Sequence, residues 1–209
     1  LRALADAVIV GAGTLRAEPR HRWTPAHVAP ALAGEYQALR AALGKPRPPL
    51  TVLVTARGDL DLSWPVFSAG QAPVLLVTGA EGARALGRQA LPSGVELAEV
   101  AAPTAAITAP AILAATTAAL RRGAQPTPSA PTTLLVEGGP HLLGDFLAAK
   151  LLDEQFLTLA PHIAGRDGHA NRPGLTAGHL FAPEHMLAAR LHSVRRAGSH
   201  LFLRYGLGA

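Results

Sequence analysis

Short apolar runs alternate along this chain with longer segments in which apolar and polar residues mix. The clearest runs, at residues 8–10, 50–54 and 74–77, consist mostly of branched aliphatic side chains and end at a glycine or a threonine. Strands that are buried on both faces of a parallel sheet have this continuous apolar character. We therefore predict strands at these three places and, from shorter runs, at residues 95–97, 133–136 and 155–159.

Several of the mixed segments repeat apolar positions with the helical period. Leu32, Tyr36, Leu39 and Leu43 lie three or four residues apart, which predicts a helix over residues 31–43. The same period predicts helices over residues 107–120 and directly after residue 140, and a weaker helix that ends near residue 89.

Near the C-terminus the pattern changes to two extended segments with a tight turn between them. Residues 187–194 and 200–205 flank Ala197-Gly198-Ser199, which predicts a β-hairpin. Strands alternate with helices through the rest of the chain. We therefore predict one α/β domain over residues 1–209, with a mostly parallel central sheet and this C-terminal hairpin as its antiparallel edge.

Composition narrows the classes of protein that this pattern can represent. Apolar residues make up 49% of the 209 residues and charged residues 16%, as expected for a folded domain. The chain has no cysteine, which excludes disulfides, thiolate metal sites and a cysteine nucleophile. No apolar run approaches the roughly 18 residues that a membrane span needs, so we expect a soluble, cytoplasmic protein.

The formal net charge of +5 is carried mainly by arginines that are spread along the chain. Proteins that bind nucleic acids usually gather basic residues on one face, often beside aromatic side chains. Aromatic residues make up only 4% of this chain, so we expect no nucleic-acid partner. Dispersed arginines suit small ligands that carry phosphate or carboxylate groups.

Two of the predicted strands run directly into glycine-rich turns, which read Gly11-Ala12-Gly13-Thr14 and Glu137-Gly138-Gly139-Pro140. Glycines at a strand–helix turn let an anion approach the backbone, and free N–H groups at a helix N-terminus attract phosphate. Two such turns in one sheet could hold an extended pyrophosphate from both sides. For each turn alone, an ordinary strand–helix connection is the competing interpretation.

The first turn does not match the dinucleotide fingerprint of Rossmann folds. That fingerprint needs a third glycine three residues after the second, where this chain has Arg16. It also needs an acidic residue at the end of a second strand, and the corresponding region near Glu35 has a helical pattern. A dinucleotide bound at these turns would therefore be held in a different way.

Three segments together resemble a known family: ADAVIVGAGTLRAE, LLVEGGPHLLGDFLAAKLLDEQFLTLAPHIAG and GSHLFLRY. They are similar to the riboflavin-biosynthesis reductase, which is the C-terminal domain of the bifunctional deaminase-reductase and has stand-alone pyrimidine reductase relatives. The resemblance implies a dihydrofolate-reductase-like fold with helices on both faces of the sheet. It also implies a homodimer, for which hairpin residues 201–203 offer an apolar edge, and hydride transfer from NADPH to 5-amino-6-(5-phosphoribosylamino)uracil.

This resemblance, read together with the glycine turns, assigns roles to individual residues. The candidate cofactor-binding residues are Gly11, Gly13, Thr14, Glu18, Thr55, Gly138, Gly139, Pro140, His141, Leu142, Leu143 and Gly144. The candidate substrate-binding residues are Arg2, Arg20 and Glu137, with Arg22 as an alternative to Arg20. Glu137 is also the candidate catalytic group, because the matched motifs offer no better proton donor.

The chain departs from the family pattern at two places. The opening strand with its Ser-x-Asp-Gly-type turn has no counterpart, so we expect the domain to lack its first strand. The acidic-acidic-proline segment is reduced to Glu18-Pro19. Two alternatives therefore stay open: a reductase of another pteridine-like or folate-like substrate, and a noncatalytic nucleotide-binding module of the same fold.

Three further features could suggest a metal site, a pair of catalytic carboxylates or a stacking surface for a ligand, but their spacing and position in the sequence favour none of these. The nine histidines show no metal-ligand spacing, so we expect no metal site. Asp59 and Asp61 resemble a carboxylate pair, but their place on a turn favours solvated side chains. We expect the cluster Trp64-Pro65-Val66-Phe67 to serve packing rather than ligand stacking.

Overall fold

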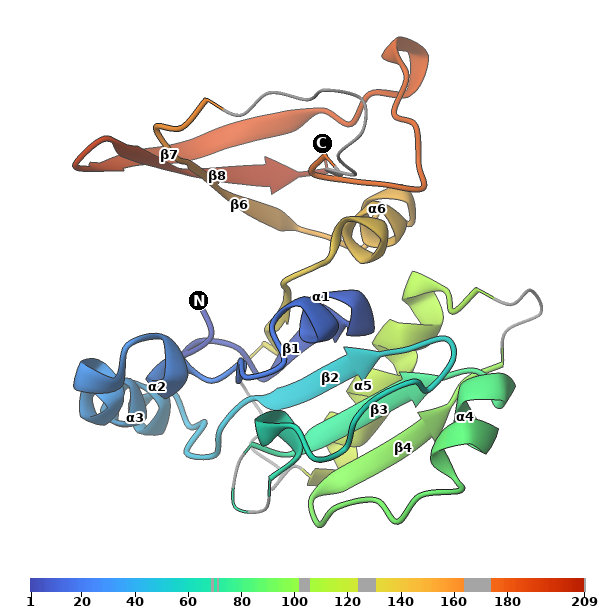
Figure 1. Ribbon diagram of the computed structural model, residues 1–209. Coiled ribbons are helices and arrows are strands. Elements are labelled where there is room, and N and C mark those ends of the chain that lie inside the picture. The colour runs from blue at the N-terminus through green and yellow to red at the C-terminus, as the bar shows by residue number, and fades with distance from the viewer. Residues whose placement is uncertain (69, 71, 102–105, 124–130, 164–173, 209) are drawn as a thin grey trace. The chain divides into compact units, whose positions relative to one another are not determined.

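The computed structural model describes residues 1–68, 70, 72–101, 106–123, 131–163 and 174–208. The chain divides into two compact units, Leu1–Gly139 and Pro140–Ala209, and each unit has its own sheet (Figure 1). We describe the two units separately. The expectations that residues 1–209 act as one domain, and that this domain lacks a first strand, stay predictions.

The first unit is built on a five-stranded parallel sheet with the order β4-β3-β2-β1-β5. Its strands are β1 (Ala7–Gly11), β2 (Leu50–Val54), β3 (Val74–Thr78), β4 (Val95–Glu99) and β5 (Leu134–Val136). Each lies where an apolar run predicts a strand. β1 lies inside the sheet between β2 and β5, and its four consecutive buried residues fit this place, because an interior strand needs apolar side chains on both faces.

Helices connect these strands. They are α1 (Ala12–Ala17), α2 (Pro25–Val28), α3 (Ala33–Ala42), α4 (Ala80–Leu86) and α5 (Ala109–Gly123), with short 3-10 turns at Pro30–Leu32 and Pro65–Phe67. The connection through α4 leads from β3 to its neighbour β4, whereas α5 leads back across the sheet to β5. Because such crossovers are right-handed, the reversal places α4 and α5 on opposite faces of the sheet (Figure 1).

The core of this unit lies between the sheet and the connections that cover it. Val8, Val10, Leu53 and Leu76 from the strands pack in one cluster with Leu15, Trp23, Phe67 and Leu86. The predicted packing role of residues 64–67 is confirmed, because Val66 and Phe67 are almost fully buried in this cluster.

Helix α3 confirms the predicted helix, but its buried face differs from the apolar pattern. Leu32, Leu39 and Leu43 are each more than 40% exposed, whereas Arg40 is only 6% exposed. The apolar repeat therefore predicts the helix correctly, but it does not predict which side of the helix is buried.

The second unit contains α6 (Pro140–Ala148) and a three-stranded antiparallel sheet with the order β6-β8-β7. Its strands are β6 (Glu154–Leu159), β7 (Ala189–Ala197) and β8 (His200–Leu207), and a short 3-10 turn lies at Pro183–His185. The predicted hairpin is β7–β8. It pairs with β6 instead of forming an edge of the parallel sheet, because β8 exchanges its other row of hydrogen bonds with β6.

A parallel sheet with helices, followed by a separate antiparallel sheet that contains the predicted hairpin, confirms the predicted α/β fold class. Within the ranges given above, no helix combines the length and the apolar character that crossing a bilayer requires.

Candidate functional site

The two glycine-rich turns lie side by side at the carboxyl ends of β1 and β5. The strands are parallel neighbours, with Ile9 opposite Val136. At the carboxyl end of β1, the Gly11 N–H donates a hydrogen bond of 2.8 Å to the carbonyl oxygen of Gly138, two residues after the end of β5. The structure thus brings together two segments that are far apart in the sequence and that the glycine pattern had linked.

This pair of strands is also where the strand order of the sheet reverses. The chain passes from β1 to β4 in one direction and then returns to place β5 on the other side of β1. In open parallel sheets, ligands bind outside the carboxyl ends of the strands at such a reversal. The topology therefore favours a ligand site beside Gly11 and Gly138.

The glycines of the two turns differ in what their backbone requires. Gly138 has a φ of +88°, a conformation that favours glycine, and it is joined to Gly139 by a cis peptide bond. Gly11 has a φ of −77°, which any residue adopts. A side chain at Gly11 would lie 3.6 Å from the Gly139 nitrogen, and one at Gly13 would meet nothing within 4 Å. Among the described residues of the first unit, neither conformation nor packing explains the glycines at positions 11 and 13.

Thr14, the last residue of the first turn, faces the second turn. A Cβ built on Gly139 would lie 3.3 Å from the Thr14 hydroxyl oxygen, so this half-buried side chain contacts the second turn closely. The structure therefore places Gly11, Gly13, Thr14, Gly138 and Gly139 around one region of the first unit.

Arg2 and Glu137 form a bidentate ion pair. The Arg2 Nε and Nη2 atoms donate hydrogen bonds of 2.6 Å to the two carboxylate oxygens of Glu137. The side chains are 13% and 24% exposed, so the pair is shielded but reaches solvent. Charge-assisted bidentate pairs of this kind fix both groups in orientation. Both oxygens of Glu137 act as acceptors here.

His21 extends this ion pair. The Arg2 Nη1 atom lies 2.9 Å from the His21 Nε2 atom and also donates to the Arg22 carbonyl oxygen at 3.3 Å. Because a guanidinium group can only donate, His21 accepts through Nε2 and its ring is neutral in this arrangement. The ring also packs edge-on against Trp23 and His27, with centroid distances of 4.9 and 4.7 Å.

We expect the melting temperature to fall as the pH is lowered from about 8 to about 5, and His21 to contribute to that fall. Burial, together with Arg2 and His27, holds the pKa of His21 below its ordinary value of 6.5. Just below that pH the unfolded chain therefore binds more protons at this residue than the folded protein does. Stability decreases as the pH falls through this window, because the unfolded state gains those protons.

The variant His21→Gln should show a shallower fall in melting temperature over the same pH range. His162→Gln, which alters an exposed histidine, is the matched control and should follow the unmodified protein. Equal slopes for all three proteins would contradict a role for the neutral His21 ring.

The other predicted residues of the first unit differ in their exposure and contacts. Glu18 and Arg20 are exposed, whereas Arg22 is half-buried and its carbonyl oxygen accepts a hydrogen bond from Arg2. Thr55 is buried at the end of β2, where its hydroxyl oxygen accepts a hydrogen bond of 3.1 Å from the Gly58 N–H. Asp59 forms an exposed ion pair with Arg16 at 3.0 Å rather than a pair with Asp61.

The remaining predicted cofactor residues belong to α6 in the second unit. Leu142 and Gly144 are buried there, Pro140 and Leu143 are half-buried, and His141 is exposed. A side chain at Gly144 would lie 2.7 Å from the Ala177 carbonyl oxygen, so packing within this unit explains that glycine. Cofactor contacts of residues 140–144 stay a prediction.

In the part of the chain that the structure describes, no group of three or more histidine, aspartate or glutamate side chains could hold a metal ion. His21 was not among the predicted site residues. Its only signal in the sequence is its position between the two candidate arginines, Arg20 and Arg22.

Comparison with known proteins adds to this geometry. The family described as RibD C-terminal domain matches residues 1–203. No match was found among curated protein sequences. Solved structures with a similar fold include a pyrimidine reductase-like protein from Corynebacterium diphtheriae NCTC, which is 23% identical with a TM-score of 0.73. That similarity covers 100% of this chain and 78% of the other.

Two further solved structures share the fold. One is a diaminohydroxyphosphoribosylaminopyrimidine deaminase/5-amino-6-(5-phosphoribosylamino)uracil reductase from Thermotoga maritima, 19% identical with a TM-score of 0.64, covering 99% of this chain and 46% of that one. The other is the riboflavin biosynthesis reductase Rib7 from Saccharomyces cerevisiae, 13% identical with a TM-score of 0.62, covering 100% of this chain and 77% of that one. These similarities confirm the predicted dihydrofolate-reductase-like fold.

Proposed function

Because this chain belongs to the family of RibD C-terminal domains, we propose that it is an NADPH-dependent reductase that transfers hydride to the ribosyl group of 5-amino-6-(5-phosphoribosylamino)uracil. Proteins that share its fold are named as reductases, one of them for this substrate. The chain spans less than half of the Thermotoga protein, whose name also includes a deaminase, and the proposal concerns the reductase activity alone.

The meeting of two glycine turns at the reversal of strand order carries this proposal. Within the described part of the first unit, a Cβ at Gly11 would make only ordinary contacts and one at Gly13 would meet no atom within 4 Å, so packing there does not require a glycine at either position. A ligand that approaches the backbone closely would explain why these two positions are glycines. We assign the cofactor to this region, with Gly11, Gly13, Thr14, Gly138 and Gly139 holding it.

Arg2 and Glu137 are the groups proposed to bind the substrate. NADPH supplies the hydride when it is bound, so the protein has to orient the ribosyl carbon and exclude water. Arg2 supplies a positive charge that attracts phosphate while its fork stays bonded to Glu137, whose carboxylate oxygens can accept further hydrogen bonds from hydroxyl or N–H groups. Because both Glu137 oxygens already accept from Arg2, the geometry favours Glu137 as an orienting group over Glu137 as the proton donor.

The variant Gly13→Ala separates cofactor binding from folding. We expect its affinity for NADPH to fall about tenfold or more, which corresponds to roughly 1.4 kcal/mol, because the added methyl group would stand where the cofactor approaches. Its stability should stay unchanged or rise, since the site is open and alanine favours a helix over glycine. Quenching of tryptophan fluorescence measures the first quantity and thermal unfolding the second.

Gly34→Ala is the matched control, because Gly34 also lies in a helix with nothing within 4 Å of the added carbon. It should leave NADPH affinity unchanged. Equal affinities of Gly13→Ala and the unmodified protein would place the cofactor elsewhere. No binding of NADPH or NADH by the unmodified protein would overturn the reductase proposal, and oxidation of NADPH only with a pteridine or folate substrate would select the alternative reductase.

A homodimer is also part of the proposal. On the sheet of the second unit, the strand register places Leu159, Leu201, Val194 and Leu191 on one face, and each is at least 36% exposed. Exposed apolar side chains that gather on one face of a sheet are typical of protein–protein contacts. This face includes Leu201 and Leu203 of the predicted apolar edge, whereas Phe202 lies on the opposite face.

A further inference from the structure

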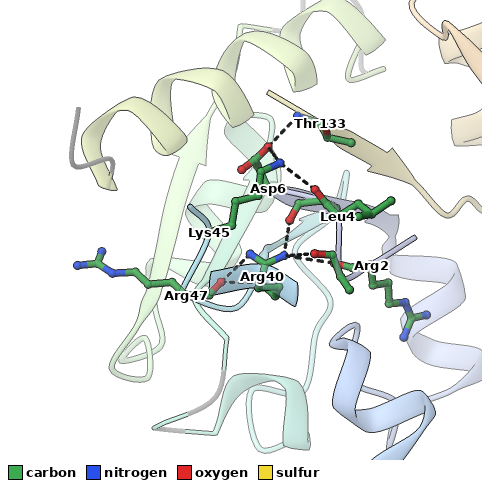
Figure 2. Close-up of polar contacts among 9 residues, drawn as sticks. Arg2, Leu4, Asp6, Arg40, Lys45, Arg47 and Thr133 are labelled. Atoms are coloured by element: carbon green, nitrogen blue, oxygen red, sulfur yellow. Dashed lines mark hydrogen bonds and ion pairs between the residues drawn. The ribbon is translucent and has the colours of Figure 1, made fainter. Parts of the chain in front are cut away.

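Arg40 is a buried cation. Among the described residues, every hydrogen bond that its guanidinium group donates goes to a backbone carbonyl oxygen. Arg40 lies on α3 and is 6% exposed. Its Nη1 atom donates to the carbonyl oxygens of Ala5 at 2.7 Å, Ala3 at 3.0 Å and Arg2 at 3.5 Å. Its Nε and Nη2 atoms donate to the Arg47 carbonyl oxygen at 2.9 and 2.6 Å (Figure 2).

Burying this charge is unfavourable. Burial lowers the pKa of the Arg40 guanidinium below its ordinary value, and nearby Asp6 opposes that shift only in part. Among the ion pairs of the described residues, none includes Arg40. A buried arginine without a carboxylate partner contributes through the geometry that it imposes on its acceptors.

Those acceptors belong to the segment that carries Arg2. Residues 1–6 precede β1 and form no strand of their own. Arg40 holds three of their carbonyl groups, and Lys45 donates to a fourth, that of Leu4, at 2.8 Å. Lys45 also pairs with Asp6 at 2.7 Å, and the same Asp6 oxygen accepts from the Thr133 N–H just before β5. The segment is therefore fixed by two cations and anchored next to the strand that leads to Glu137.

Arg2 itself contacts Arg40 only through its backbone. Figure 2 shows the Arg2 side chain pointing away from the Arg40 guanidinium, in keeping with the direction of its bonds to Glu137 and His21. Arg40 thus fixes the backbone of Arg2, and Glu137 fixes the orientation of the Arg2 guanidinium group.

We propose that Arg40 is a positioning residue for the reductase: by holding the carbonyl groups of Arg2, Ala3 and Ala5, it orients the Arg2–Glu137 pair for binding the substrate. This inference rests on the proposed function, in which Arg2 and Glu137 bind the substrate. The planar guanidinium fork reaches Arg47 from one side and the segment of Arg2 from the other. A lysine, with one nitrogen, cannot make both sets of contacts.

A double-mutant cycle tests the proposal. Arg40→Lys should lower kcat/KM for the pyrimidine substrate about tenfold, mainly through KM, and leave NADPH affinity unchanged. In the Arg2→Met background the same change should have almost no effect, because the residue that Arg40 positions is gone. Equal losses in both backgrounds, or no loss beside an intact Arg2, would overturn the proposal.

A second measurement does not depend on activity. The Arg2 Nε–H group donates to Glu137, so its proton resonance should exchange slowly with water, and the Arg2→Met variant identifies the signal. We expect Arg40→Lys to accelerate this exchange severalfold, whereas Arg84→Lys, which alters an exposed arginine, should not. Unchanged exchange in Arg40→Lys would refute the positioning role. An inactive unmodified protein with the expected exchange would instead refute the proposed function alone.

Discussion

Replacing Arg2 by methionine is expected to lower kcat/KM for the pyrimidine substrate by about a hundredfold or more, the range found when a charged transition-state or substrate contact is removed. In the proposed function, the Arg2 guanidinium group supplies the positive charge that attracts the substrate phosphate, and in the structure it holds both oxygens of Glu137. Without it, Glu137 loses its orientation and the substrate loses a cationic partner. Steady-state kinetics with varied substrate, at saturating NADPH, measure the effect.

Glu137→Gln should reduce kcat/KM to a similar degree, and the double variant should be little worse than either single one, because the two residues act as a pair. NADPH affinity should change by less than about twofold in each case. Arg122→Met is the matched control, since Arg122 forms an exposed ion pair with Glu96 and such pairs contribute little. Loss of activity in this control, or full activity in Arg2→Met, would remove Arg2 and Glu137 from the site.

Gly82→Ala is expected to destabilise the protein by about 3 kcal/mol, the upper range for overpacking a core. A Cβ at Gly82 would lie 2.0 Å from the Thr78 hydroxyl oxygen, 2.9 Å from the Ala56 carbonyl oxygen and 3.0 Å from the Gly58 nitrogen. Two of these atoms are backbone, and Thr78 is a stiff β-branched residue that is fully buried. The added methyl group therefore has to push α4 away from the turn that follows β2.

Urea or thermal unfolding, followed by circular dichroism, measures this loss. Gly34→Ala, which meets nothing within 4 Å, should be neutral or stabilising by up to about 1 kcal/mol. If Gly82→Ala were as stable as Gly34→Ala, the close contact between α4 and the turn at Gly58 would be wrong.

The strands could be predicted from the sequence because burial on both faces leaves a local signature. β1, β2 and β3 are short runs of branched apolar residues, and each forms within a residue or two of the predicted bounds. The pairing of the hairpin with β6 could not be predicted in this way. It depends on hydrogen bonds between segments whose own sequences are compatible with more than one neighbour.

Helix α3 shows a second limit. Its apolar repeat predicts a helix, yet Arg40 is buried while Leu39 is exposed. Periodicity registers the polarity of side chains, and it contains no information on distant carbonyl groups that need donors. The role of Arg40 follows only from the fold, because its acceptors in residues 2–5 lie more than 30 positions away.

The candidate site was predictable where glycines and the family resemblance marked it. The two turns and the residues Arg2 and Glu137 could be named from the sequence, and the structure adds their contacts. His21 could not be named, because a single histidine in a loop has no characteristic spacing. Its contact with Arg2 depends on how the segment after α1 returns toward the first residues of the chain.

The distance in sequence between the two halves of the site has a consequence for biosynthesis. Arg2 and Glu137 are separated by 135 positions, and β1 gains its β5 neighbour only through residues 134–136. On the ribosome, β1 to β4 can pair before β5 has emerged, since their connections are already complete. The nascent chain would then have formed four strands of the sheet, while the second of the two glycine-rich turns proposed to bind the cofactor has not yet been made. A cofactor bound at these two turns would therefore stabilise the finished protein without guiding the early steps of its folding.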